Sequence, residues 1–193
     1  MTASSTRCCR RHSWLSALAA LWLLVAALPA AHAEGIEVRK AALVAAEDGY
    51  FLEADFEITL THTLEEALNK GVPLYFALEF ELIRPRWYWF NEKLADAQQH
   101  YRLSFNALTR QYRVGVGTLY QNFDSLREAL GFLSRVRLRE IAEPGALSKG
   151  TAYTAAVRLR LDASQLPRPF QISAVGSREW SVASDWHRWT VSP

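Results

Sequence analysis

The chain has 193 residues, and its 22 lysines and arginines nearly balance its 20 aspartates and glutamates, so the formal net charge is +2 at pH 7. Nucleic-acid-binding domains usually carry a pronounced basic excess, so this composition excludes a polyanion binder. The two cysteines, Cys8 and Cys9, lie near the N-terminus, which leaves the rest of the chain without a disulfide, a thiolate nucleophile or a cysteine metal site.

Residues 1–33 have the three parts of a secretory signal peptide in the usual order. These parts are a basic head, an apolar run and a small-residue cleavage pattern: Arg7, Arg10 and Arg11, then residues 14–28, then Ala31-x-Ala33. We expect cleavage after Ala33 and a periplasmic or otherwise exported mature chain. An uncleaved membrane anchor is the minor alternative, because residues 14–31 approach the length of about 20 apolar residues that crosses a bilayer.

Cleavage would remove three basic residues and both cysteines and leave 160 residues with 19 basic and 20 acidic side chains. A chain of this length can bury about two-thirds of its unfolded surface. We therefore expect residues 34–193 to form a single strand-rich globular domain. No lipid anchor is expected, because both cysteines precede the apolar run instead of following it.

Alternation of apolar and polar residues predicts half-buried strands. The clearest strand covers residues 50–60, and the pattern recurs over residues 74–82 and 153–161. Each of these segments has one polar face. This favours antiparallel sheets, because strands of parallel sheets are covered on both faces and read as continuous apolar runs.

Two hairpins and a final strand complete the predicted sheets. Asp48-Gly49 predicts a tight turn between a strand over residues 36–47 and the strand that follows, because glycine accepts the positive φ of such turns. Residues 101–116 predict a second hairpin with its loop at residues 106–111. The last strand is expected over residues 186–191.

Two short helices are predicted from capping boxes, in which a hydroxyl side chain satisfies a free backbone amide at the helix start. The boxes are Thr63-x-x-Glu66, whose helix would end at Gly71, and Ser125-x-x-Glu128. Leucines and alanines at helical spacing in both segments predict faces that pack on a sheet. The segment Leu166-Pro-Arg-Pro-Phe170 is interpreted as a stiff crossover between strands.

The histidines of the expected mature chain, His62, His100 and His187, match no known catalytic or metal-binding motif. Asp96 and His100 are expected to share a helix face, and Asp185 and His187 a strand face. Two ligands do not make a zinc site. We therefore expect no catalytic residue, no metal and no cofactor.

Glu79 and Glu81 project from one side of a predicted strand, where a glycosidase could hold its acid and its base. Their neighbours alternate so regularly that the solvated face of a strand is the favoured interpretation.

The most unusual segment is Arg84-Pro-Arg-Trp-Tyr-Trp-Phe-Asn91. One interpretation is a segment buried on both sides, with arginine stems over the rings. The other is a recognition surface, since Trp, Tyr and Arg are enriched at binding hot spots, and a sugar-stacking or membrane-interface platform is a variant of it. Pro85 predicts a sheet edge or a bulge. The candidate interaction residues are Arg84, Arg86, Trp87 and Trp89.

Several motifs together resemble the proteobacterial family called domain of unknown function 4390. They are Arg84-x-Arg-Trp-Tyr-Trp-Phe-Asn91, Tyr101-Arg-Leu103, Ala107-Leu-Thr-Arg-Gln-Tyr-Arg113, Leu126-Arg-Glu-Ala-Leu130, Leu166-Pro-Arg-Pro-Phe-Gln171 and the segment from Trp180 to Trp186. The resemblance implies an exported bacterial protein, in a family whose genes often lie beside the gene of a membrane sensor kinase. It implies no catalytic residue or ligand.

We therefore predict a mainly β fold, an antiparallel β-sandwich-like domain with two short helices; the alternative is an α+β fold with both helices on one face of an antiparallel sheet. The expected function is a non-enzymatic periplasmic binding or accessory module, with an envelope protein such as a sensor-kinase external domain as partner. The alternatives are a glycan-binding protein or hydrolase of the cell envelope, using Glu79, Glu81 or Asp96, and a purely structural envelope protein.

Overall fold

The computed structural model describes residues 35–86, 88, 92–174 and 177–193, which belong to a compact unit formed by residues 34–193. The expected signal peptide, residues 1–33, lies outside the described residues. Within them, no helix is both long and apolar enough to cross a membrane.

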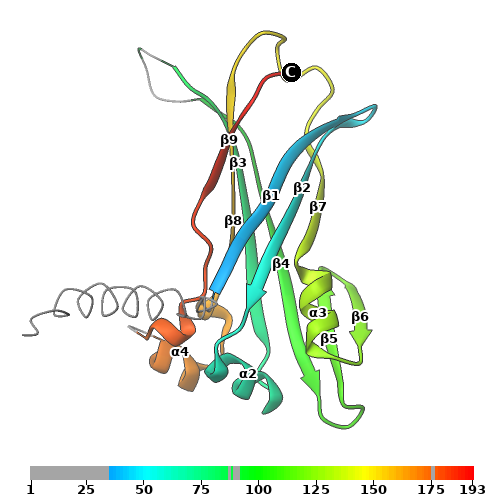
Figure 1. Cartoon of the computed structure of the whole chain (residues 1–193), viewed down its shortest axis with the longest axis vertical. Coiled ribbons are helices and arrows are strands. Elements are labelled where there is room, and N and C mark those ends of the chain that lie inside the picture. The colour runs from blue at the N-terminus through cyan, green and yellow to red at the C-terminus, as the bar shows by residue number, and fades with distance from the viewer. Residues whose placement is uncertain (1–34, 87, 89–91, 175–176) are drawn as a thin grey trace, which may run out of the picture. The chain divides into compact units, whose positions relative to one another are not determined.

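Two antiparallel sheets form the fold, which is mainly β and sandwich-like (Figure 1). The three-stranded sheet has the order β1 (Gly35–Ala46), β2 (Gly49–Thr59) and β7 (Arg135–Ala142). The six-stranded sheet has the order β6 (Leu119–Phe123), β5 (Gln111–Val116), β4 (Glu92–Asn106), β3 (Leu74–Arg84), β8 (Tyr153–Leu161) and β9 (His187–Val191). The prediction of an antiparallel β-sandwich-like domain is confirmed.

The predicted strands and hairpins are present, with the expected pairing. The turn between β1 and β2 is formed by residues 47 and 48, one residue before the predicted Asp48-Gly49 turn, and Gly49 opens β2 opposite Ala46. Tyr101 lies opposite Val116 in the second hairpin. The alternating apolar side chains of β2, β3 and β8 point between the two sheets. There they form the core, which includes Leu52, Phe76, Phe80, Tyr153 and Leu159, all at most 1% exposed.

The helix α2 (His62–Asn69) begins two residues earlier than its capping box predicts. Its N-cap is Thr61, whose hydroxyl accepts a hydrogen bond from the amide of Leu64. Thr63 is therefore the wrong cap, and its hydroxyl donates instead to the Glu179 carboxylate at 2.7 Å. The helix α3 (Leu126–Leu133) has the predicted cap, since the Ser125 hydroxyl accepts from the amide of Glu128.

The segment after β8 connects it to β9, as the crossover interpretation predicts, but it is helical, which that interpretation did not include. It contains the short 3-10 helix η1 (Ala163–Gln165), then α4 (Arg168–Ala174) and the 3-10 helix η2 (Arg178–Trp180). Proline is accepted in the first turn of a helix, where its missing amide costs nothing. α2 and α4 lie at one end of the sandwich, whereas α3 packs beside β5, β6 and β7 with Ala129 and Leu133 buried (Figure 1).

Candidate functional site

The predicted interaction residues lie at the end of the long β3–β4 hairpin. Arg84 ends β3 and is partly buried near Tyr153; the backbone amide of Ser148 and, more weakly, the Arg84 charge lower the pKa of that tyrosine. Arg86 is exposed and forms an ion pair with Glu92 at the start of β4.

The two tryptophans of the predicted interaction surface, Trp87 and Trp89, lie outside the described residues. Tyr88, between them, is 67% exposed. The structure therefore describes Arg84 and Arg86 at this hairpin end, together with one exposed aromatic side chain.

Glu79 is held by two arginines of the neighbouring strand β8. Its carboxylate accepts a hydrogen bond from Nε of Arg158 at 3.0 Å and one from Nε of Arg160 at 2.8 Å. Burial raises the pKa of Glu79, but these bonds and charges outweigh it, and the pKa lies below its usual value. A carboxyl group that stays ionised in this way is a poor general acid near neutral pH.

Glu81 lies on the same outward face as Glu79 and has its own partner. Nζ of Lys93 lies 3.1 Å from the Glu81 carboxylate and 3.8 Å from that of Asp96. The hydrogen bond that Lys93 donates to Glu81, ahead of the charges of Glu81 and Asp96, raises the pKa of Lys93. The solvated-face interpretation fits Glu81 better than Glu79, whose side chain is only 19% exposed.

The described residues contain no group of three or more histidine, cysteine or carboxylate side chains placed to hold a metal ion. Asp96 and His100 share a face of the strand β4, so the expected helix at this position is wrong. The His187 ring lies 5.8 Å from the ring of Trp189.

The C-terminal tryptophans contact the core and side chains of the six-stranded sheet. Trp180 is buried at 6% exposure, and the ring of Trp189 lies 6.3 Å from that of Phe80. The Trp186 ring lies 4.6 Å from the guanidinium carbon of Arg158. These three rings are therefore occupied by contacts within the chain, which disfavours a sugar-stacking platform built from them.

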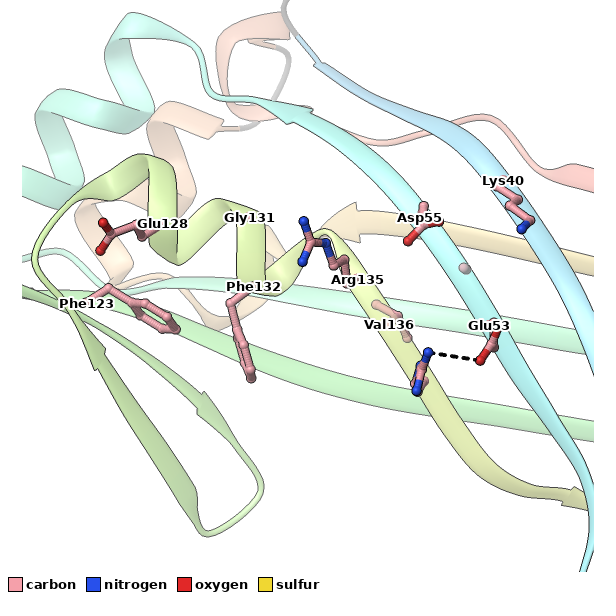
Figure 2. Close-up of a pocket in the computed structure, with 11 residues that line it drawn as sticks. Lys40, Glu53, Asp55, Phe123, Glu128, Gly131, Phe132, Arg135 and Val136 are labelled. Carbon is pink, nitrogen blue, oxygen red and sulfur yellow. Dashed lines mark ion pairs between the residues drawn. The ribbon is translucent and has the colours of Figure 1, made fainter.

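A hollow of about 730 Å³ lies where α3 leads into β7 (Figure 2). Charged side chains of the three-stranded sheet line one side, namely Lys40, Glu53, Asp55, Arg135 and Arg137, and residues of β6 and α3 line the other. A second hollow of about 330 Å³ continues along the outer face, and Glu53 and Arg137 line both. We call these two hollows together the β7 groove.

The outer face of β7 is a row of three arginines at alternate positions, Arg135, Arg137 and Arg139. In the sheet register Arg135 lies opposite Asp55, and Arg137 lies opposite Glu53. Arg137 pairs with Glu53 at 3.2 Å, and its side chain remains 77% exposed. Among the described residues, neither Arg135 nor Arg139 has a carboxylate within ion-pair distance.

An aromatic pair lies at the α3 end of the β7 groove. The rings of Phe123 and Phe132 lie 5.4 Å apart, and Phe132 is 40% exposed. Gly131 precedes Phe132 on α3 and has open space where a side chain would be. Figure 2 shows Phe123 and Phe132 on the helix side of the hollow, with Arg135 between them and the sheet.

The β7 groove was not predicted from the sequence, although residues of α3 were. The alternation Arg-Val-Arg-Leu-Arg over residues 135–139 is a period-two signal for a strand with one basic face. That signal predicts a strand with one basic face, but it does not show which edge of the strand lacks a neighbouring strand. The groove depends on the pairing of β7 with β2, which is far away in the sequence.

Comparison with known proteins gives one match. The chain matches the model of the family described as domain of unknown function (DUF4390) over residues 33–190. No curated protein matches it, and no solved structure does. Because this match spans nearly the whole length and includes the motifs between residues 84 and 186, the chain belongs to the DUF4390 family.

Proposed function

We propose that this protein is an exported, non-enzymatic binding or accessory module that recognises another protein of the cell envelope. The observation that carries the proposal is the β7 groove, in which exposed arginines and an aromatic pair lie together beside an edge strand. Arginine and aromatic side chains are the residue types most often found at binding hot spots.

The proposed partner is the external domain of a membrane sensor kinase. Its support is the gene neighbourhood implied by the family resemblance. The hairpin end with Arg84, Arg86, Trp87 and Trp89 is a second proposed contact surface, supported by the exposure of Arg86 and Tyr88.

A glycan hydrolase is less well supported. The ionised state of Glu79 and the pairing of Glu81 with Lys93 fit a structural role for these carboxylates better than general acid catalysis. A hydrolase also needs an accessible sugar platform, and the described C-terminal tryptophans contact other parts of the chain instead.

Photo-crosslinking in the native host tests the proposal. A photoreactive phenylalanine would replace Phe132 in the groove, Tyr88 at the hairpin end, or the control residue Tyr120, which is 58% exposed on β6. We expect one identified envelope protein to be attached at position 132 or 88 and not at 120. If folded, exported protein gave no such adduct at either position, the binding function would be rejected.

A further inference from the structure

The strand β7 has one paired edge and one open edge. Its only pairing is with β2, and no backbone hydrogen bond joins its other side to any residue that the structure describes. Figure 1 shows β7 at the side of the three-stranded sheet, with β1 at the opposite side. Free amides and carbonyls of this kind can pair with an extended segment of another chain.

The arginine row of β7 already has acidic neighbours on its paired side. β2 places Asp55 opposite Arg135 and Glu53 opposite Arg137, and opposite charges across two strands stabilise pairing. The open side of the same arginines has no such strand among the described residues. A segment of another chain with carboxylates at alternate positions could place them opposite the same arginines from the open side, as β2 does with Asp55 and Glu53 from the paired side.

The opposite sheet is also incompletely covered below this open edge. β5 pairs only with residues 101–106 of β4, so residues 92–100 of β4 pair with β3 alone among the described strands. Ala95 and Ala97 pack against the core from this half of β4 but stay partly exposed. β7 lies next to β4, so a strand added at the open edge of β7 would lie close to the six-stranded sheet.

The two ends of the β7 groove differ in their lining. Phe123 and Phe132 lie at the α3 end, whereas Arg139 lines only the hollow toward the end of β7. A ligand should therefore have its carboxylates toward Arg139 and an apolar side chain toward Phe132. In the antiparallel direction, its acidic residues precede its apolar one.

We infer that β7 accepts an additional strand from an acidic, extended segment of a partner protein, whose carboxylates lie along Arg135, Arg137 and Arg139. This inference rests on the proposed function and names the chemistry of the partner. A second copy of this chain does not fit by pairing β7 with β7, because two arginine rows would face each other.

Edge strands also carry charges simply to prevent aggregation. The two explanations predict different results. Protection predicts that an acidic peptide does not bind, and that removal of the arginines causes self-association. Strand addition predicts a saturable complex with new hydrogen bonds on β7 alone.

The probe is a capped peptide of alternating Glu and Val ending in Leu, added to the purified full-length protein. Hydrogen exchange should slow in residues 135–142 and remain unchanged in β1 and β9, two edge strands outside the β7 groove. Two further peptides carry N-methyl groups on all Glu residues or on all Val residues, which blocks one edge of the added strand in each case. We expect one methylated peptide to bind like the parent and the other to lose binding. Equal behaviour of the two, whether both bind or neither does, overturns strand addition.

The matched variants test the charges. R137E/R139E should weaken binding of the acidic peptide about tenfold and favour a peptide with Lys in place of Glu. R102E/R113E makes the same charge change on exposed arginines of β4 and β5 and should leave affinity unchanged. If R137E/R139E is unfolded, R139Q, which disturbs no described ion pair, should still weaken binding severalfold. Equal weakening by the control variant overturns the assignment to β7.

The two proposals can fail separately. An envelope protein crosslinked at position 132 without any protection of β7 by the acidic peptide would leave the binding function standing and reject strand addition. Protection of β7 without a crosslinked envelope protein would keep the strand-accepting edge and reject the proposed function.

Discussion

The guanidinium carbon of Arg158 lies 4.6 Å from the centre of the Trp186 ring, and the same guanidinium donates to the carboxylate of Glu79. Three segments far apart in the sequence thus meet on the outer face of the six-stranded sheet. Glu79 is the common acceptor, because Arg160 also donates to it. The side chain of Glu79 is 19% exposed, so solvent weakens these interactions less than it would on an open surface.

Replacing Glu79 by Gln should lower the free energy of unfolding by about 2 kcal/mol, because it removes the charged acceptor of two partly buried arginines. Urea denaturation at pH 7 measures the change. Glu143→Gln is the matched control, since Glu143 is exposed and has no described ion pair, and it should stay within about 0.5 kcal/mol of wild type. An equal loss in both variants would show that Glu79 contributes nothing through its arginines.

The stability contribution of Glu79 should depend on pH in a defined direction. Its pKa is lowered in the folded chain, so the contribution is complete above the reference value of 4.5 and is lost as the pH falls through the lower folded value. Denaturation from pH 7 to pH 2 should therefore bring wild type and Glu79→Gln together at the acid end. A difference that persists unchanged at pH 2 would contradict the assignment.

Tyr101 should titrate late. Burial raises the pKa of Tyr101 to about 12, because the phenolate would lose its hydration. A folded-state pKa above the unfolded value means that stability is complete below about pH 10 and falls as the pH rises toward 12. NMR of ring-labelled tyrosine should show one late titration that disappears in Tyr101→Phe. A Tyr101 resonance that titrates near pH 10 in folded protein would refute this.

Gly49 should tolerate no side chain. Its φ is +127°, and a Cβ atom there would lie 2.5 Å from the carbonyl oxygen of Ala142. Gly49→Ala should cost about 2 kcal/mol or more. Gly131→Ala is the contrasting control: its site is open and lies inside α3, so alanine should stabilise the chain by up to about 1 kcal/mol. Thermal denaturation should move in opposite directions for the two variants, and a shift in the same direction would be evidence against this backbone argument.

The two threonines at the start of α2 should differ in importance. Thr61 is buried, caps the helix and donates to the carbonyl of Glu179 at 2.9 Å, so Thr61→Ala should cost about 1–2 kcal/mol. Thr63 contacts the exposed Glu179 carboxylate, so Thr63→Ala should cost less than about 0.5 kcal/mol. Thr61→Ser keeps the hydroxyl and should retain most of the stability. A larger loss of stability for Thr63→Ala than for Thr61→Ala in urea denaturation would identify Thr63 as the cap instead.

Local signals in the sequence predicted the elements that depend on neighbouring residues. Asp48-Gly49 predicted the β1–β2 hairpin to within one residue, because Gly49, whose φ is positive, directly follows the two turn residues 47 and 48. The start of α2 was predicted two residues too late, because Thr61 and Thr63 are both good caps. The sequence gives no sign of the contact between Thr61 and Glu179, which lies far along the chain. The helix α4 was not predicted because its two prolines were interpreted as a stiff crossover between strands, although a proline can lie just before a helix or in its first turn.

The candidate site was less predictable for a related reason. The aromatic run after Arg84 was predicted as an interaction surface because its composition alone is unusual. The β7 groove combines ordinary residues of four strands and one helix, and the open edge of β7 follows from the strand order. The alternation of arginines can be read from a single sequence, but the lack of a strand beside the open edge of β7 cannot, because it depends on the strand order.

The strand order also determines when the chain can complete its core. β2 cannot complete its pairing until β7 has been made, and β3 cannot complete its pairing until β8 has been made. β8 in turn pairs with β9, the last strand of the chain. As the chain is made from its N-terminus, only sequential hairpins can form early, while Leu52 and Phe80 remain without their distant partners. Pairings between distant residues slow folding and prolong the exposure of apolar surface. We therefore expect a late, cooperative folding step and dependence on a holding chaperone until the C-terminal segment has emerged.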